Sequence, residues 1–227
     1  MSNKTKTIAL AGHMGSGKDT AAGIVLNIIN DAQSYAFADH LKKISVEVAG
    51  LSNNEVYGDE KEKELDNPIV LDHDLTAAIH NWVIARNPDY DNMTVFNKAQ
   101  LLIADGNRVF NTSRRWQQFL GTEILRECYD LDYHINQVAK RIKDDKPSVA
   151  VITDARFPNE REWAKEFGAT TALIVGRTRD DFNSFNTHAS ETGLGVPEDY
   201  DVVIDNSGTI EDLKHKVVNV LEVLEAL

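Results

Sequence analysis

The residues best suited to chemistry lie near the N-terminus of the chain. They form the run Gly12-His13-Met14-Gly15-Ser16-Gly17-Lys18-Asp19-Thr20. Glycines let the backbone curl until successive N–H groups point at phosphate oxygens, and a following helix adds the positive end of its dipole. A lysine at this place brings its charge to a phosphoryl group in transfer. The run predicts a phosphate-binding loop of the Walker A type.

The residue after the lysine departs from the usual pattern. A Ser or Thr normally stands there and binds Mg²⁺ through its hydroxyl, whereas this chain has Asp19 followed by Thr20. A carboxylate is a good hard ligand for Mg²⁺, directly or through water. Asp19 could instead act as a base for the attacking oxygen, or simply begin a helix after a glycine-rich turn. Asp19 and Thr20 are the candidate metal ligands.

Two further charged residues follow a second apolar run. Asp154 and Arg156 come directly after residues 148–153 (SVAVIT), which predict a buried strand. Ligands of open α/β sheets bind at the carboxyl ends of the strands, so both side chains should face the same crevice as the phosphate loop. The alternative is a structural ion pair at the end of a strand.

Basic and polar residues also gather in the middle of the chain. Asp39 and Lys42 lie in FADHLKK, and Arg114 and Arg115 open RRWQQFLGTE. Two more candidates, Gln118 and Thr122, lie four and eight residues after Arg114, on one face of a predicted helix. A Gln amide suits the edge of a base, and a Thr hydroxyl suits a sugar or phosphate. The alternative for the arginines is a solvated helix face.

The elements that position these residues alternate between strand and helix at both ends of the chain. Short apolar runs predict strands at 6–12, 148–153, 170–175 and 201–205, and a weaker one at 34–37; helical periodicity covers 18–30, 158–167 and 210–226. This order predicts an α/β fold, a parallel sheet flanked by helices as in P-loop NTPases. We expect 1–38 and 146–227 to form the core sheet. Residues 39–145, which lack strong strand signals, should form a mainly helical substrate-binding insertion.

Composition narrows the class of protein. The chain has 227 residues with a formal net charge of -12, which disfavours a nucleic-acid polymer as partner. No apolar run approaches the roughly 20 residues that span a bilayer, so we expect no membrane partner. A single cysteine, Cys128, excludes an internal disulfide and fits a reducing cytoplasm.

Taken together, the motifs resemble a known family. GSGKDT, FADHLKK, RRWQQFLGTEI, ITDARFPNEREWAKEFGA, NTHASETGL and DVVIDNSGTIEDL are similar to segments of the deoxynucleoside monophosphate kinases of tailed phages. Those proteins are P-loop kinases related in fold to adenylate and guanylate kinases. The motifs occur in the same order along nearly the whole chain, with only a loose match over 50–100.

The resemblance implies the ligands and their residues. ATP would be the co-substrate and Mg²⁺ the metal ion. The residues that bind this cofactor pair would be Gly15, Ser16, Gly17, Lys18, Asp19, Thr20, His188 and Asn206, and Asn206 would lie near the adenine. The nucleoside monophosphate would lie against Asp39, Lys42, Arg114, Arg115, Gln118, Thr122, Asp154 and Arg156. Residues 177–192 would form a lid that carries Arg177. Catalysis would rest on Lys18, Asp19, Arg115, Arg156 and Arg177. The resemblance also allows a homodimer, for which no segment gives evidence.

Three other readings stay open at this point. A P-loop kinase of another small phosphorylated acceptor, such as phosphomevalonate or dephospho-coenzyme A, shares the loop, although Gln118 suits a base better than an isoprenoid. A nucleotide-dependent regulatory protein such as a GTPase would need an Asn-Lys-x-Asp stretch, and neither Asn-Lys pair of the chain, Asn3-Lys4 and Asn97-Lys98, continues in that way. The charge argues against a nucleic-acid-dependent ATPase.

Overall fold

The computed structural model describes residues 5–13, 15–58, 64–90, 93–176 and 193–224. The chain divides into two compact units. The first comprises Met1–Phe37 and Ile135–Leu227, and the second comprises Ala38–His134. Among the described residues, no helix combines the length and the apolar character that crossing a membrane requires.

The first unit is built on a five-stranded parallel sheet with the strand order β2-β5-β1-β6-β7. Its strands are β1 (Lys6–Ala11), β2 (Ala32–Tyr35), β5 (Val149–Ile152), β6 (Thr170–Val175) and β7 (Val202–Asp205). The central strand β1 pairs with β5 on one side and β6 on the other, so that Ala9 lies opposite both Ile152 and Thr171. Every residue of β5 is buried, as expected for a strand covered on both faces.

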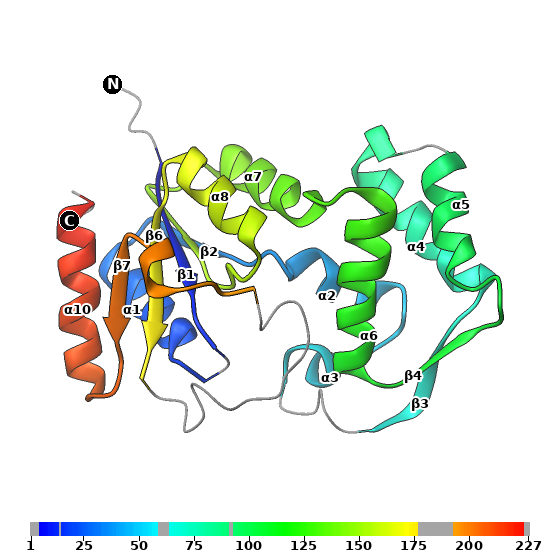
Figure 1. Ribbon diagram of the computed structural model, residues 1–227, viewed down its shortest axis with the longest axis horizontal. Coiled ribbons are helices and arrows are strands. Elements are labelled where there is room, and N and C mark those ends of the chain that lie inside the picture. The colour runs from blue at the N-terminus through cyan, green and yellow to red at the C-terminus, as the bar shows by residue number, and fades with distance from the viewer. Residues whose placement is uncertain (1–4, 14, 59–63, 91–92, 177–192, 225–227) are drawn as a thin grey trace. The chain divides into compact units, whose positions relative to one another are not determined.

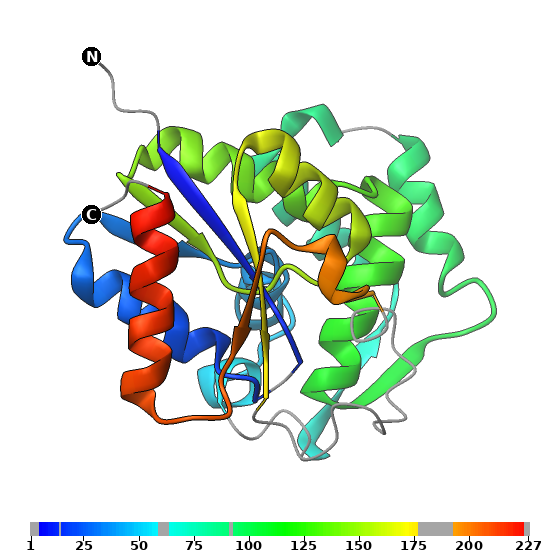
Figure 2. The same ribbon diagram turned by 60° about the vertical axis from the view of Figure 1, so that its left-hand side comes forward.

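Helices cover both faces of this sheet (Figures 1 and 2). On one face α1 (Lys18–Ile28) and α10 (Ile210–Val223) pack on β1 and its neighbours through a cluster that includes Leu10, Val25 and Leu221. On the other face, α7 (Tyr133–Asp145) and α8 (Pro158–Phe167) contribute Val138 and Ala164 to a second cluster. The α/β class predicted from the sequence is confirmed.

The second unit is mostly helical. Its elements are α2 (Asp39–Glu47), α3 (Asn53–Tyr57), β3 (Glu64–Leu71), α4 (His73–Arg86), the 3-10 helix η2 (Pro88–Tyr90), α5 (Met93–Leu101), β4 (Arg108–Thr112), α6 (Ser113–Phe119) and the π-helix η3 (Leu120–Tyr129). Trp116 and Leu120 are fully buried in its separate core. The Trp116 indole also donates a hydrogen bond to Ser45 Oγ at 3.0 Å, which joins α6 to α2.

Two features of the second unit differ from the sequence-based expectation. Strands β3 and β4 form an antiparallel pair, although the segment carries no clear strand signal. In β3 (ELDNPIVL) a register shift lies between Glu64 and Ile69, and β4 (RVFNT) is largely exposed, so neither shows a clean apolar alternation. The unit also ends at His134 rather than at 145, because residues such as Ile135 and Ile142 of α7 pack on the sheet of the first unit.

Candidate functional site

The connection between β1 and α1 is a curled loop with its glycines in conformations that other residues rarely adopt. Gly12, Gly15 and Gly17 have φ angles of 145°, 80° and 100°. Gly17 is the N-cap of α1, and no side chain among the described residues caps this helix end. The first N–H groups of α1 are therefore available to an anion, and the positive end of the helix dipole favours one.

Lys18 places its charge at this loop. The residue is only 7% exposed, and its Nζ donates hydrogen bonds to the carbonyl oxygens of Gly12 at 2.8 Å and His13 at 2.7 Å. The ammonium group is thus held across the curled backbone rather than extended into solvent. A phosphate group in the loop would meet both the backbone N–H groups and this positive charge.

Gly17 has no room for a side chain. A Cβ atom added there would lie 2.2 Å from Asn206 Nδ2, and the φ of 100° would strain any L-residue. We expect Gly17→Ala to abolish measurable ATP binding in calorimetry, because the loop must change shape to accept the methyl group. The fold should survive, since Gly17 lies outside the apolar clusters of the sheet.

Gly23→Ala is the matched control for this substitution. Gly23 lies inside α1, where an added Cβ meets nothing within 4 Å. Alanine favours the helix over glycine by about 0.5–1 kcal/mol, so this variant should melt at a higher temperature and bind ATP normally. Normal ATP binding by Gly17→Ala would contradict the loop geometry described here.

Asp19 and Thr20 lie in the first turn of α1, and both are exposed. They offer oxygen ligands of the kind that Mg²⁺ prefers. The buried Ser16 Oγ nearby has no hydrogen-bond partner among the described residues. Within the described ranges, no cluster of three His, Cys, Asp or Glu residues could enclose a metal ion. The donor set fits an ion held by one or two protein ligands together with phosphate oxygens.

Asp154 and Arg156 lie at the sheet edge from which the phosphate loop departs. They follow β5, which neighbours β1, and the N–H of Ala155 between them donates to the Leu10 carbonyl of β1 at 3.1 Å. Asp154 Oδ1 accepts a hydrogen bond from the Phe37 N–H at 2.7 Å. The structure therefore brings Asp154, Arg156 and the loop to one edge within the first unit.

Glu160 is a supporting residue that the sequence did not reveal. Its Oε2 accepts hydrogen bonds from the backbone N–H groups of Arg156 at 2.8 Å and Phe157 at 3.0 Å, and the residue is 2% exposed. It thereby fixes the backbone that carries Arg156. The sequence signature of such a cap usually begins with Ser or Thr, whereas Phe157 stands at that position. Only Pro158 and the acidic Glu160 in the first turn of α8 indicate the start of a helix, and neither indicates a contact with the backbone of Arg156.

The remaining residues expected to bind the nucleoside monophosphate belong to the second unit. Asp39 and Lys42 lie on α2, and Lys42 Nζ is 5.3 Å from the centre of the Tyr57 ring. Arg115 is exposed on α6, and its backbone N–H donates to Thr112 Oγ1, the N-cap of that helix, at 3.3 Å. Because α2 and α6 pack together, this unit brings the two groups of candidates onto adjoining helices.

The spacing argument for Gln118 and Thr122 holds only in part. Arg114 and Gln118 are four residues apart in the α-helix α6, partly buried, and share a face. Thr122 lies beyond the change to the π-helix η3, where hydrogen bonds join residues five apart. Its direction therefore does not follow from the α-helical period.

Comparison with known proteins relates this geometry to a family. The sequence of residues 59–217 matches the family described as deoxynucleotide monophosphate kinase. The chain belongs to this family. The matched range leaves out residues 12–20, so the phosphate loop is a separate observation that agrees with membership of a kinase family.

Viral relatives of this kinase match it along most of its length. A putative deoxynucleotide monophosphate kinase of Acanthamoeba polyphaga mimivirus is 27% identical, with 95% of each chain covered. The deoxynucleoside-5'-monophosphate kinase of Escherichia phage T5 is 28% identical over 93% of this chain and 94% of its own. The deoxynucleotide monophosphate kinase of Enterobacteria phage T4 is 26% identical over 96% of this chain and 100% of its own. Among solved structures, TT1252 from Thermus thermophilus aligns over 97% of this chain and 98% of its own, with a TM-score of 0.49 and 14% identity, a likeness too distant to carry a functional conclusion.

Some candidates of the kinase lie outside the described residues. These are Arg177 and His188, together with the whole expected lid, 177–192. Their roles stay predictions.

Cys128 of the kinase is a buried thiol. Burial, and secondarily the charge of Glu127, raise its pKa to about 11, and its Sγ donates to the Glu123 carbonyl at 3.1 Å. At pH 8 only about one molecule in a thousand then carries the thiolate, which is the reactive form. We expect Ellman's reagent to modify the folded protein slowly at pH 8 and rapidly in denaturant.

The same pKa determines how stability depends on pH. The pKa is higher in the folded state than the roughly 8.5 of an exposed thiol, so the thiol form favours folding. That contribution is complete below pH 8.5 and is lost as the pH rises towards 11. Rapid modification of the native protein at pH 8 would contradict the burial of this side chain.

Proposed function

We propose that this kinase transfers the γ-phosphoryl group of ATP to the 5'-phosphate of a deoxynucleoside monophosphate, and that the products are ADP and the deoxynucleoside diphosphate. The observation that carries the proposal is the phosphate loop. Lys18 is held over a curled backbone at the N-terminus of α1, in a chain of the deoxynucleotide monophosphate kinase family.

The phosphates of ATP would be bound by the backbone N–H groups of the loop residues Gly15, Ser16 and Gly17, of which that of Ser16 donates to the His13 carbonyl at 3.1 Å in this structure. Lys18 would exchange its hydrogen bonds to the Gly12 and His13 carbonyls for phosphate oxygens. Asp19 and Thr20 would hold Mg²⁺, which supplies charge neutralisation between the phosphate groups. Phosphoryl transfer asks the protein mainly for position and charge, and these residues provide both.

The acceptor would be bound by guanidinium groups. Arg115 and Arg156 would bind the phosphate of the nucleoside monophosphate through paired N–H donors, which match phosphate geometry better than a single ammonium does. Asp39, Lys42, Arg114, Gln118, Thr122 and Asp154 complete the proposed set. No general base is needed, because a phosphate monoester with a second pKa near 6 is largely a dianion at neutral pH. The lid arginine Arg177 would stabilise the phosphoryl group in transfer.

Cellular context is part of the proposal. A net charge of -12 suits free nucleotides better than a nucleic-acid polymer. The family resemblance favours action in the cytoplasm of a host cell and allows a homodimer. A molar mass from light scattering, compared with the 25.3 kDa of one chain, tests the dimer.

A coupled assay of ADP release tests the proposed activity. The full chain is supplied with ATP, Mg²⁺ and each common deoxynucleoside or ribonucleoside monophosphate in turn, with phosphomevalonate and dephospho-coenzyme A as rival acceptors. We expect ADP release that depends on one or more deoxynucleotides and stops when EDTA removes Mg²⁺. Turnover with a rival acceptor alone, or hydrolysis that ignores the acceptor, would overturn the proposal.

A further inference from the structure

Asn206 joins the last strand of the sheet to the phosphate loop. It follows β7 directly, is 2% exposed, and donates from Nδ2 to the Ser16 carbonyl at 2.8 Å, across 190 residues of sequence. This is its one side-chain hydrogen bond within the described part of the chain, since its Oδ1 has no partner there. Asn206 therefore acts on the loop and not on a wider polar network.

The bond fixes the direction of one peptide group. The Ser16 carbonyl and the Gly17 N–H belong to the same peptide plane, and in a trans peptide they point in opposite directions. Because Asn206 holds the carbonyl on the β7 side, the Gly17 N–H must point away from Asn206. In a loop that binds phosphate through backbone N–H groups, the direction of this N–H determines whether it can donate to a phosphate oxygen.

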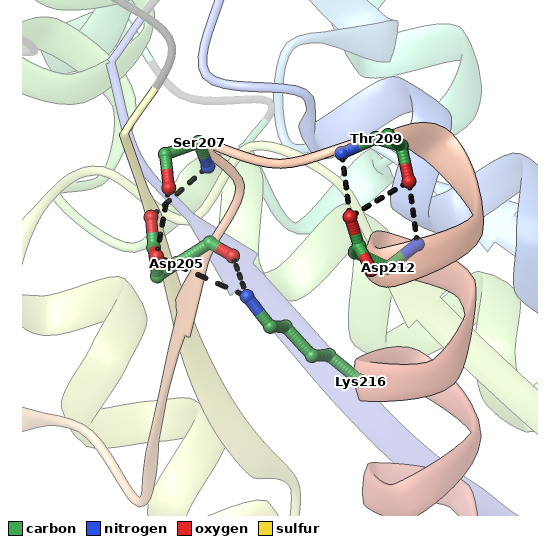
Figure 3. Close-up of polar contacts among 5 residues, drawn as sticks. All are labelled: Asp205, Ser207, Thr209, Asp212 and Lys216. Carbon is green, nitrogen blue, oxygen red and sulfur yellow. Dashed lines mark hydrogen bonds and ion pairs between the residues drawn. The ribbon is translucent and has the colours of Figure 1, made fainter.

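Asn206 is itself held in place by the turn between β7 and α10. Its backbone N–H donates to the Val175 carbonyl of β6 at 2.7 Å. Asp205 accepts from the Ser207 N–H at 3.0 Å and from its hydroxyl at 2.9 Å, and Lys216 of α10 reaches the Asp205 backbone carbonyl (Figure 3). The Ser207 hydrogen bonds, and then the Lys216 charge, hold the pKa of Asp205 below its usual range, so the carboxylate that accepts these hydrogen bonds is ionised at neutral pH.

The start of α10 adds a second restraint beside this turn. Thr209 and Asp212 form a reciprocal cap, in which the Thr209 N–H donates to the Asp212 carboxylate at 2.8 Å and the Asp212 N–H to Thr209 Oγ1 at 3.2 Å (Figure 3). Such a cap fixes where the helix begins. Asn206 is thus supported on the side of β6 and on the side of α10, as a positioning group needs to be.

We propose that Asn206 is a positioning residue for the phosphate loop, which orients the Ser16–Gly17 peptide so that its N–H faces the phosphates of the bound nucleotide. The inference rests on the proposed function only in that the loop binds phosphates. It differs from the expectation that Asn206 lies near the adenine, because a positioning role does not depend on the base.

Calorimetric titration with two probes separates these roles. Full-length wild-type protein, Asn206→Ala and Asn206→Asp are each titrated with ATP and with inorganic tripolyphosphate, which has no base, in the presence of Mg²⁺. Losing the hydrogen bond should weaken binding of both probes by roughly tenfold. Asn206→Asp, which puts an oxygen against the Ser16 carbonyl, should weaken both further. In steady-state kinetics KM for ATP should rise while KM for the acceptor stays unchanged.

Asn27→Ala is the matched control, because Asn27 is exposed on α1 and far from the loop in the helix. It should bind both probes as the wild type does. A loss confined to ATP would overturn the proposal in favour of an adenine contact, and a lower melting temperature with unchanged affinities would show a merely structural residue.

An NMR titration of the wild type with tripolyphosphate tests the proposal without any variant. The Asn206 side-chain NH₂ signals should shift when tripolyphosphate binds. The proposal would be overturned if tripolyphosphate did not bind, or if it bound and these signals did not shift. Binding of tripolyphosphate with no transfer to any deoxynucleotide would overturn the proposed function alone.

Discussion

Lys18→Ala is expected to lower kcat for phosphoryl transfer by at least about 100-fold, which is the scale of losing one preorganised charged donor in a transition state. The structure supports a specific role for this residue because the residue is 7% exposed and its ammonium group donates hydrogen bonds to the Gly12 and His13 carbonyls. A solvated surface lysine would have neither property. Initial rates of ADP release at saturating ATP and acceptor measure the effect.

The fold should tolerate the same substitution. Lys18 is not a member of the apolar clusters of the sheet, and its two hydrogen bonds, worth about 1.5–3 kcal/mol each, are lost together with the cost of burying the ammonium charge that they offset. The melting temperature should therefore change little. Lys165→Ala, on the exposed side of α8, removes the same charge from the same unit and should keep normal turnover. Near-normal turnover by Lys18→Ala would remove the phosphate loop from the mechanism.

Local signals explain why much of the first unit could be predicted. Helix α8 begins at Pro158 and ends before Gly168, which has a φ of 83°, and α10 begins after its N-cap Thr209, which forms a capping box with Asp212. Each signal involves residues within a few positions of one another. The weak strand expected at 34–37 appears as β2 at Ala32–Tyr35, because an edge strand with exposed Gln33 and Ser34 carries little apolar pattern.

Features that depend on distant parts of the chain could not be predicted in this way. The hydrogen bond from Asn206 to Ser16 depends on the neighbouring positions of β1, β6 and β7 in the sheet, which no local pattern encodes. The hydrogen bond from the Phe37 N–H to Asp154 depends likewise on the pairing of β2 with β5. The family resemblance indicated Asn206, and the position at the end of a predicted strand indicated Asp154, but the atoms that they contact came only from the structure.

The π-helix η3 shows a different limit. Residues 120–129 contain good helix formers such as Leu120 and Leu125, and periodicity predicts a helix without distinguishing its hydrogen-bond pattern. The change from α to π after Phe119 alters the direction of every later side chain. Candidates before that point keep their expected phase, and those after it, Thr122 among them, do not.

Arg115→Ala is expected to raise KM for the deoxynucleoside monophosphate by about 100-fold and to leave KM for ATP unchanged. Two charge-assisted hydrogen bonds to a phosphate are worth a few kcal/mol, which corresponds to a factor of this size. Arg115 is exposed, and no hydrogen bond or ion pair joins its guanidinium to another described residue, so its removal should not disturb the unit. The adjacent Trp116, which is fully buried, keeps α6 in place in the variant.

Two further variants decide whether geometry or charge matters at this position. Arg115→Lys keeps the charge and loses the planar pair of donors, so it should recover only part of the affinity for the acceptor. Lys98→Ala, on an exposed face of α5, removes one charge from the same unit and should leave both KM values unchanged. Full recovery in Arg115→Lys would show that the acceptor phosphate needs only a nearby positive charge. An unchanged KM in Arg115→Ala would remove this residue from the acceptor site, and Arg156 would then be the guanidinium to test.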